Sequence, residues 1–187
     1  MQWLLKGTPL FVWLVSLTGC VSVPDNVTPV ANFELQRYLG KWYEIARLDH
    51  SFERGLSHVS AEYVPRDDGG VDVINRGFNA EAGTFKQAQG RAYFVDPSAE
   101  DGSQSGYLKV SFFGPFYSSY LIFELDQDEY QYAFVSGYSH DYVWLLARAP
   151  VVDESLRQRF IKSIKNIGFD SDGLIWVDQV SDIGDGK

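Results

Sequence analysis

From residue 40 to residue 148 the sequence alternates apolar and polar side chains, and turn-forming residues interrupt the alternation at short intervals. A period of two is the pattern of a β-strand with one buried face. We expect eight strands, at 41–50, 59–64, 71–78, 85–95, 107–113, 120–125, 130–137 and 142–148. The turns between them leave no room for crossover helices. This series predicts an all-β fold, an eight-stranded antiparallel up-and-down β-barrel (a calyx), which also removes exposed sheet edges.

One amphipathic helix is expected after the strands. Asp153 is a candidate N-cap and Gly168 a candidate C-cap. The apolar positions between them are Leu156, Phe160, Ile164 and Ile167. We expect this C-terminal α-helix to pack on the outside of the barrel. A short ninth strand is expected at 174–177, so that the barrel domain spans residues 34–180 and an acidic tail follows at 181–187.

Composition narrows the classes of function. The chain of 187 residues is 45% hydrophobic and 16% aromatic, so it can bury enough surface to fold as one domain. Its formal net charge of -9 argues against binding to nucleic-acid phosphates. The single cysteine excludes an intrachain disulfide framework and a thiolate metal cluster, and we expect no metal site and no cofactor.

The first twenty residues differ from the rest of the chain. Lys6 precedes an apolar run, Leu10–Leu17, which is too short to cross a bilayer but has the length of a signal-peptide core. The run ends in Leu17–Thr18–Gly19–Cys20, which contains the only cysteine. A lone cysteine is often a small buried thiol, and that alternative stays open for Cys20. Its position directly after the apolar run favours a processing site.

Leu17–Thr18–Gly19–Cys20 resembles a bacterial lipobox. The resemblance implies that residues 1–19 are a lipoprotein signal peptide and that Cys20 receives an S-diacylglycerol and an N-acyl group. Val21, rather than an aspartate, follows the cysteine, which implies release to the outer membrane. Residues 20–33 are then expected to form a lipidated N-terminal tether. The barrel would be anchored to the bacterial outer membrane and face the periplasm.

Three short motifs resemble the signatures of the lipocalins. The residues concerned are Gly40, Trp42 and Tyr43 in the first strand, Asp141 and Tyr142 before the eighth, and Arg148 at its end. Segments 40–47 and 110–117 are similar in particular to the bacterial outer-membrane lipocalins and to the apolipoprotein D group. The resemblance implies that Arg148 packs over Trp42 at the closed end of the barrel. Such a cation–π contact stabilises, so we expect these residues to be structural and not catalytic.

The alternation also predicts which side chains line the barrel. If Trp42 and Arg148 point inward, residues two positions apart on each strand point inward as well. The calyx lining predicted in this way is Ala46, Ala61, Tyr63, Val110, Phe112, Phe123, Phe134 and Trp144. The opposite face of the eighth strand, with Val143, Leu145 and Ala147, would contact the helix. An eight-stranded barrel either is filled by side chains or holds one small ligand, and the small residues at 46 and 61 favour a cavity.

The sequence contains no convincing catalytic motif. Ser139, His140 and Asp141 are triad residue types, but neighbours along a chain cannot converge as a triad does. We therefore expect a binding protein and not an enzyme. The lipocalin resemblance implies a fatty acid such as palmitate, or a lysophospholipid, stored or transported for membrane maintenance; a homodimer stays open. The alternative is a lipocalin-like enzyme or a haem or polyene protein, for which His50 is the inward-facing candidate ligand.

Overall fold

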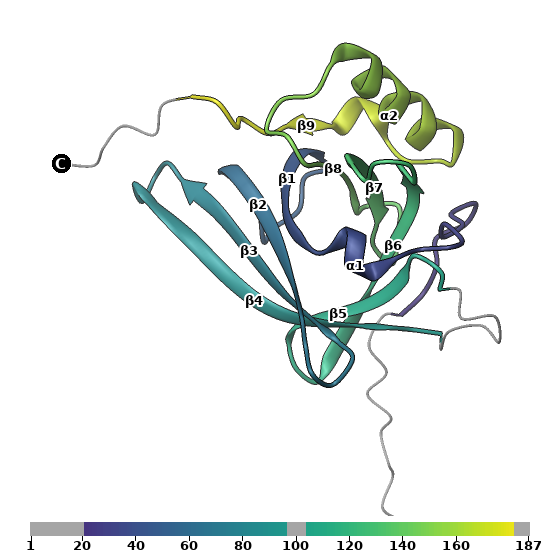
Figure 1. Ribbon diagram of the computed structural model, residues 1–187. Coiled ribbons are helices and arrows are strands. Elements are labelled where there is room, and N and C mark those ends of the chain that lie inside the picture. Colours follow the sequence, from purple (N-terminus) through teal and green to yellow (C-terminus); the bar gives the residue numbers. More distant parts are fainter. Residues whose placement is uncertain (1–20, 97–103, 182–187) are drawn as a thin grey trace, which may run out of the picture.

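Nine antiparallel strands form one sheet in the computed structural model, which describes residues 21–96 and 104–181. The strands are β1 (Gly40–Arg47), β2 (Leu56–Pro65), β3 (Val71–Asn79), β4 (Thr84–Phe94), β5 (Tyr107–Phe113), β6 (Phe116–Leu125), β7 (Tyr132–Ser136), β8 (Val143–Ala147) and β9 (Ile175–Trp176). Each strand from β2 to β8 pairs with the next, and β1 pairs with both β8 and β2, which closes the barrel (Figure 1). The short strand β9 pairs with β1 on the outside. The predicted up-and-down barrel is confirmed.

Two α-helices and one turn of 3-10 helix complete the fold: α1 (Leu35–Tyr38), α2 (Glu154–Asn166) and η1 (Ser171–Gly173). The side chain of Asp153 caps α2 by accepting a hydrogen bond from the backbone N–H of Leu156. On the inner face of α2, Phe160 and Ile164 are fully buried against the barrel wall. The predicted helix and its N-cap are confirmed. No helix within residues 21–96 and 104–181 is long and apolar enough to cross a membrane.

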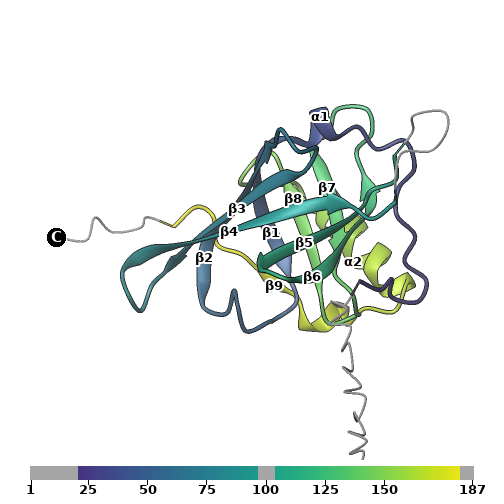
Figure 2. The same cartoon turned by 90° about the horizontal axis from the view of Figure 1, so that it is seen from below.

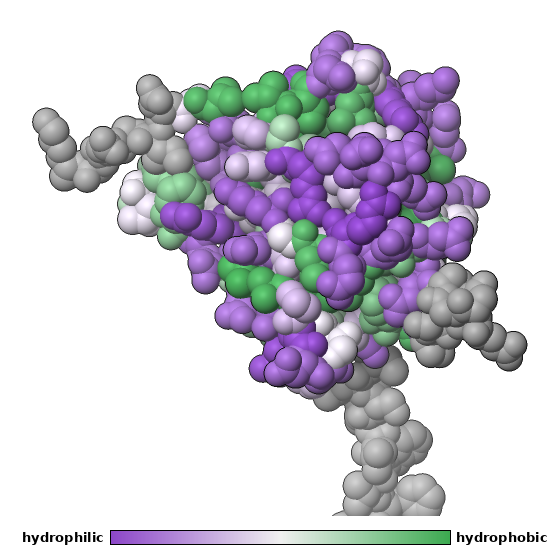
Figure 3. Space-filling model, in the orientation of Figure 1, coloured by the Kyte–Doolittle hydropathy of each residue, from purple (hydrophilic) through white to green (hydrophobic). Residues whose placement is uncertain are grey.

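The barrel has two different ends. Because strands of a meander alternate in direction, the connections 48–55, 80–83, 114–115 and 137–142 lie at one end, which we call the mouth. The other end, which we call the closed end, carries α1 across the barrel axis (Figure 2). Figure 3 shows the face at the closed end, and hydrophilic residues cover most of it.

Residues 21–33, expected to belong to the lipidated tether, lie against the barrel. They run along the outside of the barrel from the mouth to α1 (Figure 2). The backbone N–H of Val30 donates to the carbonyl of Ile122, and that of Phe33 donates to the carbonyl of Gln104. Val27 and Phe33 are buried. Backbone hydrogen bonds and buried apolar side chains therefore fix this segment to the wall.

The apolar residues form two clusters, one inside the barrel and one between its wall and α2. Three residues predicted to line the calyx, Ala46, Phe123 and Phe134, belong to the outer cluster. A β-bulge between Glu44 and Ala46 inserts one residue and turns Ala46 to the outside, whereas Phe123 follows the inward-facing Ile122 and points outward by ordinary alternation. Phe134 lies opposite Leu145 on the wall beneath α2, with its ring 4.9 Å from that of Phe160. The predicted orientation of these three side chains is wrong.

Candidate functional site

Trp42 and Arg148 meet at the closed end of the barrel. The guanidinium carbon of Arg148 lies 3.9 Å from the centre of the fully buried Trp42 ring. Arg148 also donates hydrogen bonds to four backbone carbonyls, those of Arg37, Leu39, Lys41 and Tyr130. The indole N–H of Trp42 donates to the carbonyl of Tyr38 at 2.7 Å. One cation and one indole thus join α1, the start of β1 and the end of β8.

The other motif residues have local structural contacts. Gly40 has a φ of 89°, a conformation that favours glycine, and a Cβ there would lie 3.6 Å from Nη1 of Arg148. Tyr43 faces outward beneath the ammonium of Lys41. Asp141 accepts a hydrogen bond from the hydroxyl of Ser139 in the β7–β8 connection. Tyr142 lies at the mouth, its ring 6.2 Å from that of Trp144.

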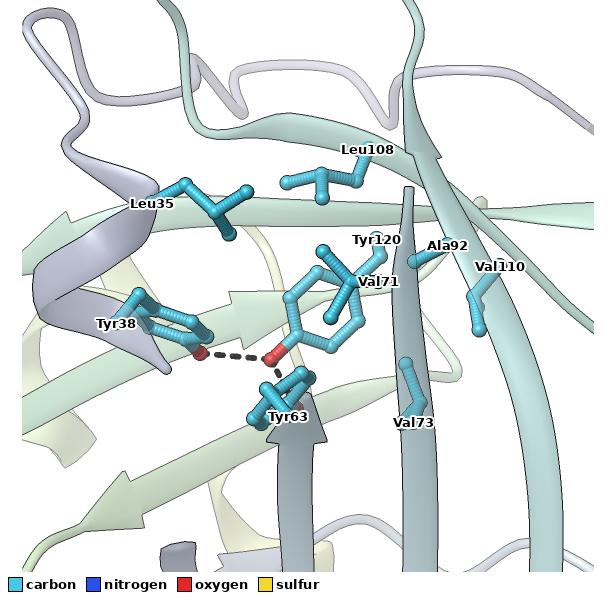
Figure 4. A pocket seen from close by; sticks show the side chains of 9 residues that line it. All are labelled: Leu35, Tyr38, Tyr63, Val71, Val73, Ala92, Leu108, Val110 and Tyr120. Atoms are coloured by element: carbon cyan, nitrogen blue, oxygen red, sulfur yellow. Dashed lines mark hydrogen bonds between the residues drawn. The ribbon is translucent and has the colours of Figure 1, made fainter. Parts of the chain in front are cut away.

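Three tyrosines share hydrogen bonds inside the closed end. The hydroxyl of Tyr120 lies 2.7 Å from that of Tyr38 and 2.6 Å from that of Tyr63 (Figure 4). Burial raises the pKa of each of these hydroxyls well above its ordinary value, so all three are neutral and can be donors. The cluster satisfies polar atoms that would otherwise be buried without partners.

A small cavity lies beside the tyrosine cluster. Its volume is about 10 Å³, which is about the space of one water probe. The residues around it are Leu35, Tyr38, Tyr63, Val71, Val73, Ala92, Leu108, Val110 and Tyr120 (Figure 4). Tyr63 and Val110, both predicted to line the calyx, are among them. At this end the barrel is almost filled by its own side chains.

The interior from the middle of the barrel to the mouth is more open. Ala61, Val110, Phe112 and Trp144 belong to the inner cluster yet keep part of their surface exposed. Strand β4 pairs with β5 only through Arg91–Phe94, so the first part of β4 continues as a hairpin with β3 away from the barrel (Figure 2). This arrangement leaves the inner face of β5 accessible. Five of the eight predicted lining residues, these four and Tyr63, are therefore in the inner cluster.

A group of charged side chains is buried inside the barrel below the mouth. Arg47 donates to Oε1 of Glu44 at 2.6 Å, and its other terminal nitrogen donates to the carbonyl of Glu53 at 2.9 Å. The Glu53 carboxylate accepts a hydrogen bond from the indole N–H of Trp144 at 3.1 Å and lies 2.9 Å from Nε2 of His50. Glu53 and His50 belong to the β1–β2 connection, which therefore folds back into the barrel.

The pKa values of the two carboxyl groups in this cluster are shifted in opposite directions. Burial, with the nearby Glu53 carboxylate, raises the pKa of Glu44 well above its ordinary value. Contacts with His50, Trp144 and Arg47 outweigh the burial of Glu53 and hold the pKa of its carboxyl below its ordinary value. Glu44, whose carboxylate forms the ion pair with Arg47, therefore takes up a proton more readily than Glu53.

No sequence pattern marks Arg47 or Glu53 as interior residues. Alternation along β1 assigns Arg47 to the outside, and the bulge after Glu44 turns it inward. Its Nε is buried and has no hydrogen-bond partner among the described residues. No group of three or more His, Cys, Asp or Glu side chains in the described ranges could hold a metal ion. Cys20 lies outside those ranges.

The histidines have separate places. His50 is buried and its ring stacks on that of Phe52 at 3.9 Å. His58 has its ring 2.9 Å from the carbonyl of Ser181, and His140 has its ring 3.0 Å from the carbonyl of Ile167. Of the three, His50 alone contacts the inner cluster, through Trp144.

Comparisons with known proteins agree with this geometry. A family model described as a lipocalin-like domain matches residues 33–179. The outer membrane lipoprotein Blc of Vibrio cholerae is 56% identical over 170 residues, which cover 91% of this chain and 96% of that protein. Apolipoprotein D of Bos taurus is 36% identical over 126 residues, 64% of this chain and 62% of that protein.

A solved structure supports the fold. The structure of insecticyanin from the tobacco hornworm Manduca sexta matches with a TM-score of 0.66 and 21% identity, over 86% of this chain and 88% of that chain. At that identity the likeness concerns the barrel and not its ligand. The family match over most of the chain and the 56% identity carry the assignment. The chain therefore belongs to the lipocalin family, among the bacterial outer-membrane lipoproteins of that family.

Proposed function

We propose that the protein binds a fatty acid or a lysophospholipid in the mouthward half of its barrel, as a lipid-anchored protein of the outer membrane with its barrel in the periplasm. The observation that carries the proposal is the accessible apolar inner face formed by Ala61, Val110, Phe112 and Trp144. The outer-membrane lipoproteins to which the chain is similar support the location.

The barrel interior has an apolar wall and, below the mouth, a cluster of charged residues, an arrangement that suits an amphiphile with one acyl chain. The tail would lie along Val110 and Phe112, and each buried methylene supplies about 0.8 kcal/mol. A tail of about 16 carbons thus has a gross driving force of about 12 kcal/mol, from which ordering and association costs are subtracted. The nearly filled closed end sets the depth that the tail can reach. Two-chain phospholipids should bind more weakly, since an eight-stranded barrel holds about one chain.

The head group would remain at the mouth, near the buried charged cluster. Arg47 Nε carries a hydrogen that no described residue accepts. A carboxylate or phosphate oxygen could accept it, and a charge-assisted hydrogen bond of this kind is short and strong. This favours an acidic or phosphate-bearing head group over a neutral one.

The test of the ligand class is native mass spectrometry of the protein purified without added lipid. We expect additional mass equal to one fatty acid or one lysophospholipid per barrel. Collisional release should return the protein to its unliganded mass. Recovery of a diacyl phospholipid, or of a chromophore with its own absorbance band, would contradict the proposal.

The test of the anchor is Cys20→Ser. The diacylglycerol and the N-acyl group together carry three acyl chains, and several chains hold a protein in a bilayer far more firmly than one, so their loss should move the protein from the outer-membrane fraction to the soluble periplasmic fraction. Val21→Ser, which changes the neighbouring side chain and keeps Cys20, is the matched control. If the Cys20→Ser variant stayed in the outer-membrane fraction, lipidation of Cys20 would not be the anchor.

A further inference from the structure

The anchored end of the chain emerges beside the mouth. The hydroxyl of Ser22 donates to the carbonyl of Tyr138 at 3.0 Å, and the carbonyl of Ser22 accepts from the hydroxyl of Ser119 at 2.6 Å. Tyr138 lies in the β7–β8 connection at the mouth, and Ser119 is close to the mouthward end of β6. From Ser22 the chain runs along the wall to α1 (Figure 2). Ser22 is therefore fixed to the rim.

The distance from Ser22 to the cysteine is short. Ser22 is the second residue after Cys20, and an extended chain spans at most about 3.6 Å per residue. A lipid group on Cys20 would then begin within about 7 Å of the rim. A long flexible linker would let the barrel turn freely, but the hydrogen bonds of residues 22–33 leave no such linker after Val21.

The rim presents exposed aromatic side chains. Phe113 is 82% exposed and Phe116 is 54% exposed, and the two face each other across the β5–β6 turn. Phe52, in the β1–β2 connection, is 60% exposed. Single exposed apolar residues are ordinary on a protein surface, but three phenylalanines on two connections at the same end of a barrel form an interaction surface.

The exposed charges of the two connections that carry these phenylalanines cancel one another. Asp49 and Arg54, the exposed charged residues of the β1–β2 connection, form an ion pair at 2.6 Å. The β5–β6 turn from Phe113 to Phe116 contains no charged residue. The face at the closed end is mainly hydrophilic (Figure 3). The two ends thus differ in the way expected of a membrane-facing and a water-facing end.

We infer that the mouth faces the membrane to which the protein is anchored, with Phe52, Phe113 and Phe116 inserted into the interfacial layer of the phospholipid bilayer. The inference rests on the proposed lipid anchor at Cys20. Aromatic rings partition favourably into that layer. In this orientation an acyl chain passes between the bilayer and the barrel interior without crossing open water.

The orientation is tested on the lipidated chain in vesicles of phosphatidylethanolamine and phosphatidylglycerol. Acylation blocks Cys20, so Phe113→Cys and Asp67→Cys each supply one thiol for a fluorescent probe; Asp67 lies in the β2–β3 turn at the closed end. A nitroxide-bearing lipid should quench the probe at position 113 strongly and leave that at position 67 bright. Equal quenching at the two positions, or stronger quenching at position 67, would overturn the inference.

A second experiment separates the rim from the anchor. In the Cys20→Ser chain, Phe113→Ser together with Phe116→Ser should weaken binding to the same vesicles by about tenfold for each phenylalanine that leaves the interface. Val151→Ser, which removes an exposed apolar side chain near the closed end, should not change binding. Equal losses in the two variants, or no loss in either, would overturn the inference even if the anchor is confirmed. Flotation of the lipidated chain against Cys20→Ser tests the anchor by itself.

Discussion

The closed end of the barrel is tightly packed, whereas the mouth contains exposed aromatic rings and buried charges. At the closed end Trp42 has no exposed surface, Arg148 bonds four backbone carbonyls, and the tyrosine hydroxyls satisfy one another. At the mouth β4 leaves the barrel, phenylalanines are exposed, and two carboxyl groups are buried beside Arg47. Because the closed end supplies much of the stability of the fold, the mouth can contain buried charges and exposed apolar side chains that do not stabilise it.

The largest expected effect comes from Trp42→Ala. Removing a fully buried aromatic ring should lower the free energy of unfolding by about 3 to 5 kcal/mol. The control at the mouth, Phe113→Ala, removes an exposed ring and should change it by no more than about 0.5 kcal/mol. Urea unfolding of both variants checks the contrast. Similar losses in the two would mean that the ends do not differ in this way.

Arg148→Ala should have an intermediate effect. It removes the cation from Trp42 and leaves carbonyls near the closed end without their donor, at a cost of about 2 kcal/mol. Ligand affinity should be preserved in protein that remains folded, because Arg148 lies away from the mouthward interior. Thermal unfolding and a lipid titration on the same sample make the comparison. An unchanged melting temperature with a lost affinity would place Arg148 in the binding site.

Glu44→Gln should show the smallest effect, as a change in pH dependence. The pKa of Glu44 is raised in the folded protein, so its contribution to stability is fully present below its ordinary value of 4.5 and is lost as the pH rises through the raised value. Glutamine does not titrate. The stability of the variant relative to the parent should therefore increase with pH above about 4.5. Urea unfolding between pH 4 and pH 8 measures it; a constant difference would show that Glu44 is not perturbed.

Much of the fold could be predicted because it depends on periodic features. Alternating strands, short turns and an amphipathic helix with Asp153 at its N-cap are local patterns, and each appears in the structure. The short helix α1 was missed, since four residues are too few for a helical period. The path of residues 21–33 was missed as well, because the hydrogen bonds that fix it join residues far apart in the sequence.

The interior of the barrel was predicted less completely. The alternation of side chains predicted the inward-facing residues correctly on β2, β5 and β8, where Ala61, Val110 and Trp144 face inward. It failed on β1, where a bulge reverses the faces and places Ala46 beneath α2, and on β6, where Ile122 faces inward and its neighbour Phe123 outward. A bulge depends on the partner strand, so one strand read alone does not reveal it. For the same reason Arg47 and its buried partners were invisible in the sequence.

Binding of an acyl tail inside the barrel is tested most directly by titration with saturated fatty acids of increasing chain length, followed by tryptophan fluorescence. Trp144 lines the mouthward interior, so a bound tail should change its emission. We expect an affinity that rises with each added methylene, by up to about 0.8 kcal/mol per methylene, and levels off once the tail reaches the filled closed end. An affinity that does not depend on chain length would contradict it, because the tail would then lie outside the barrel.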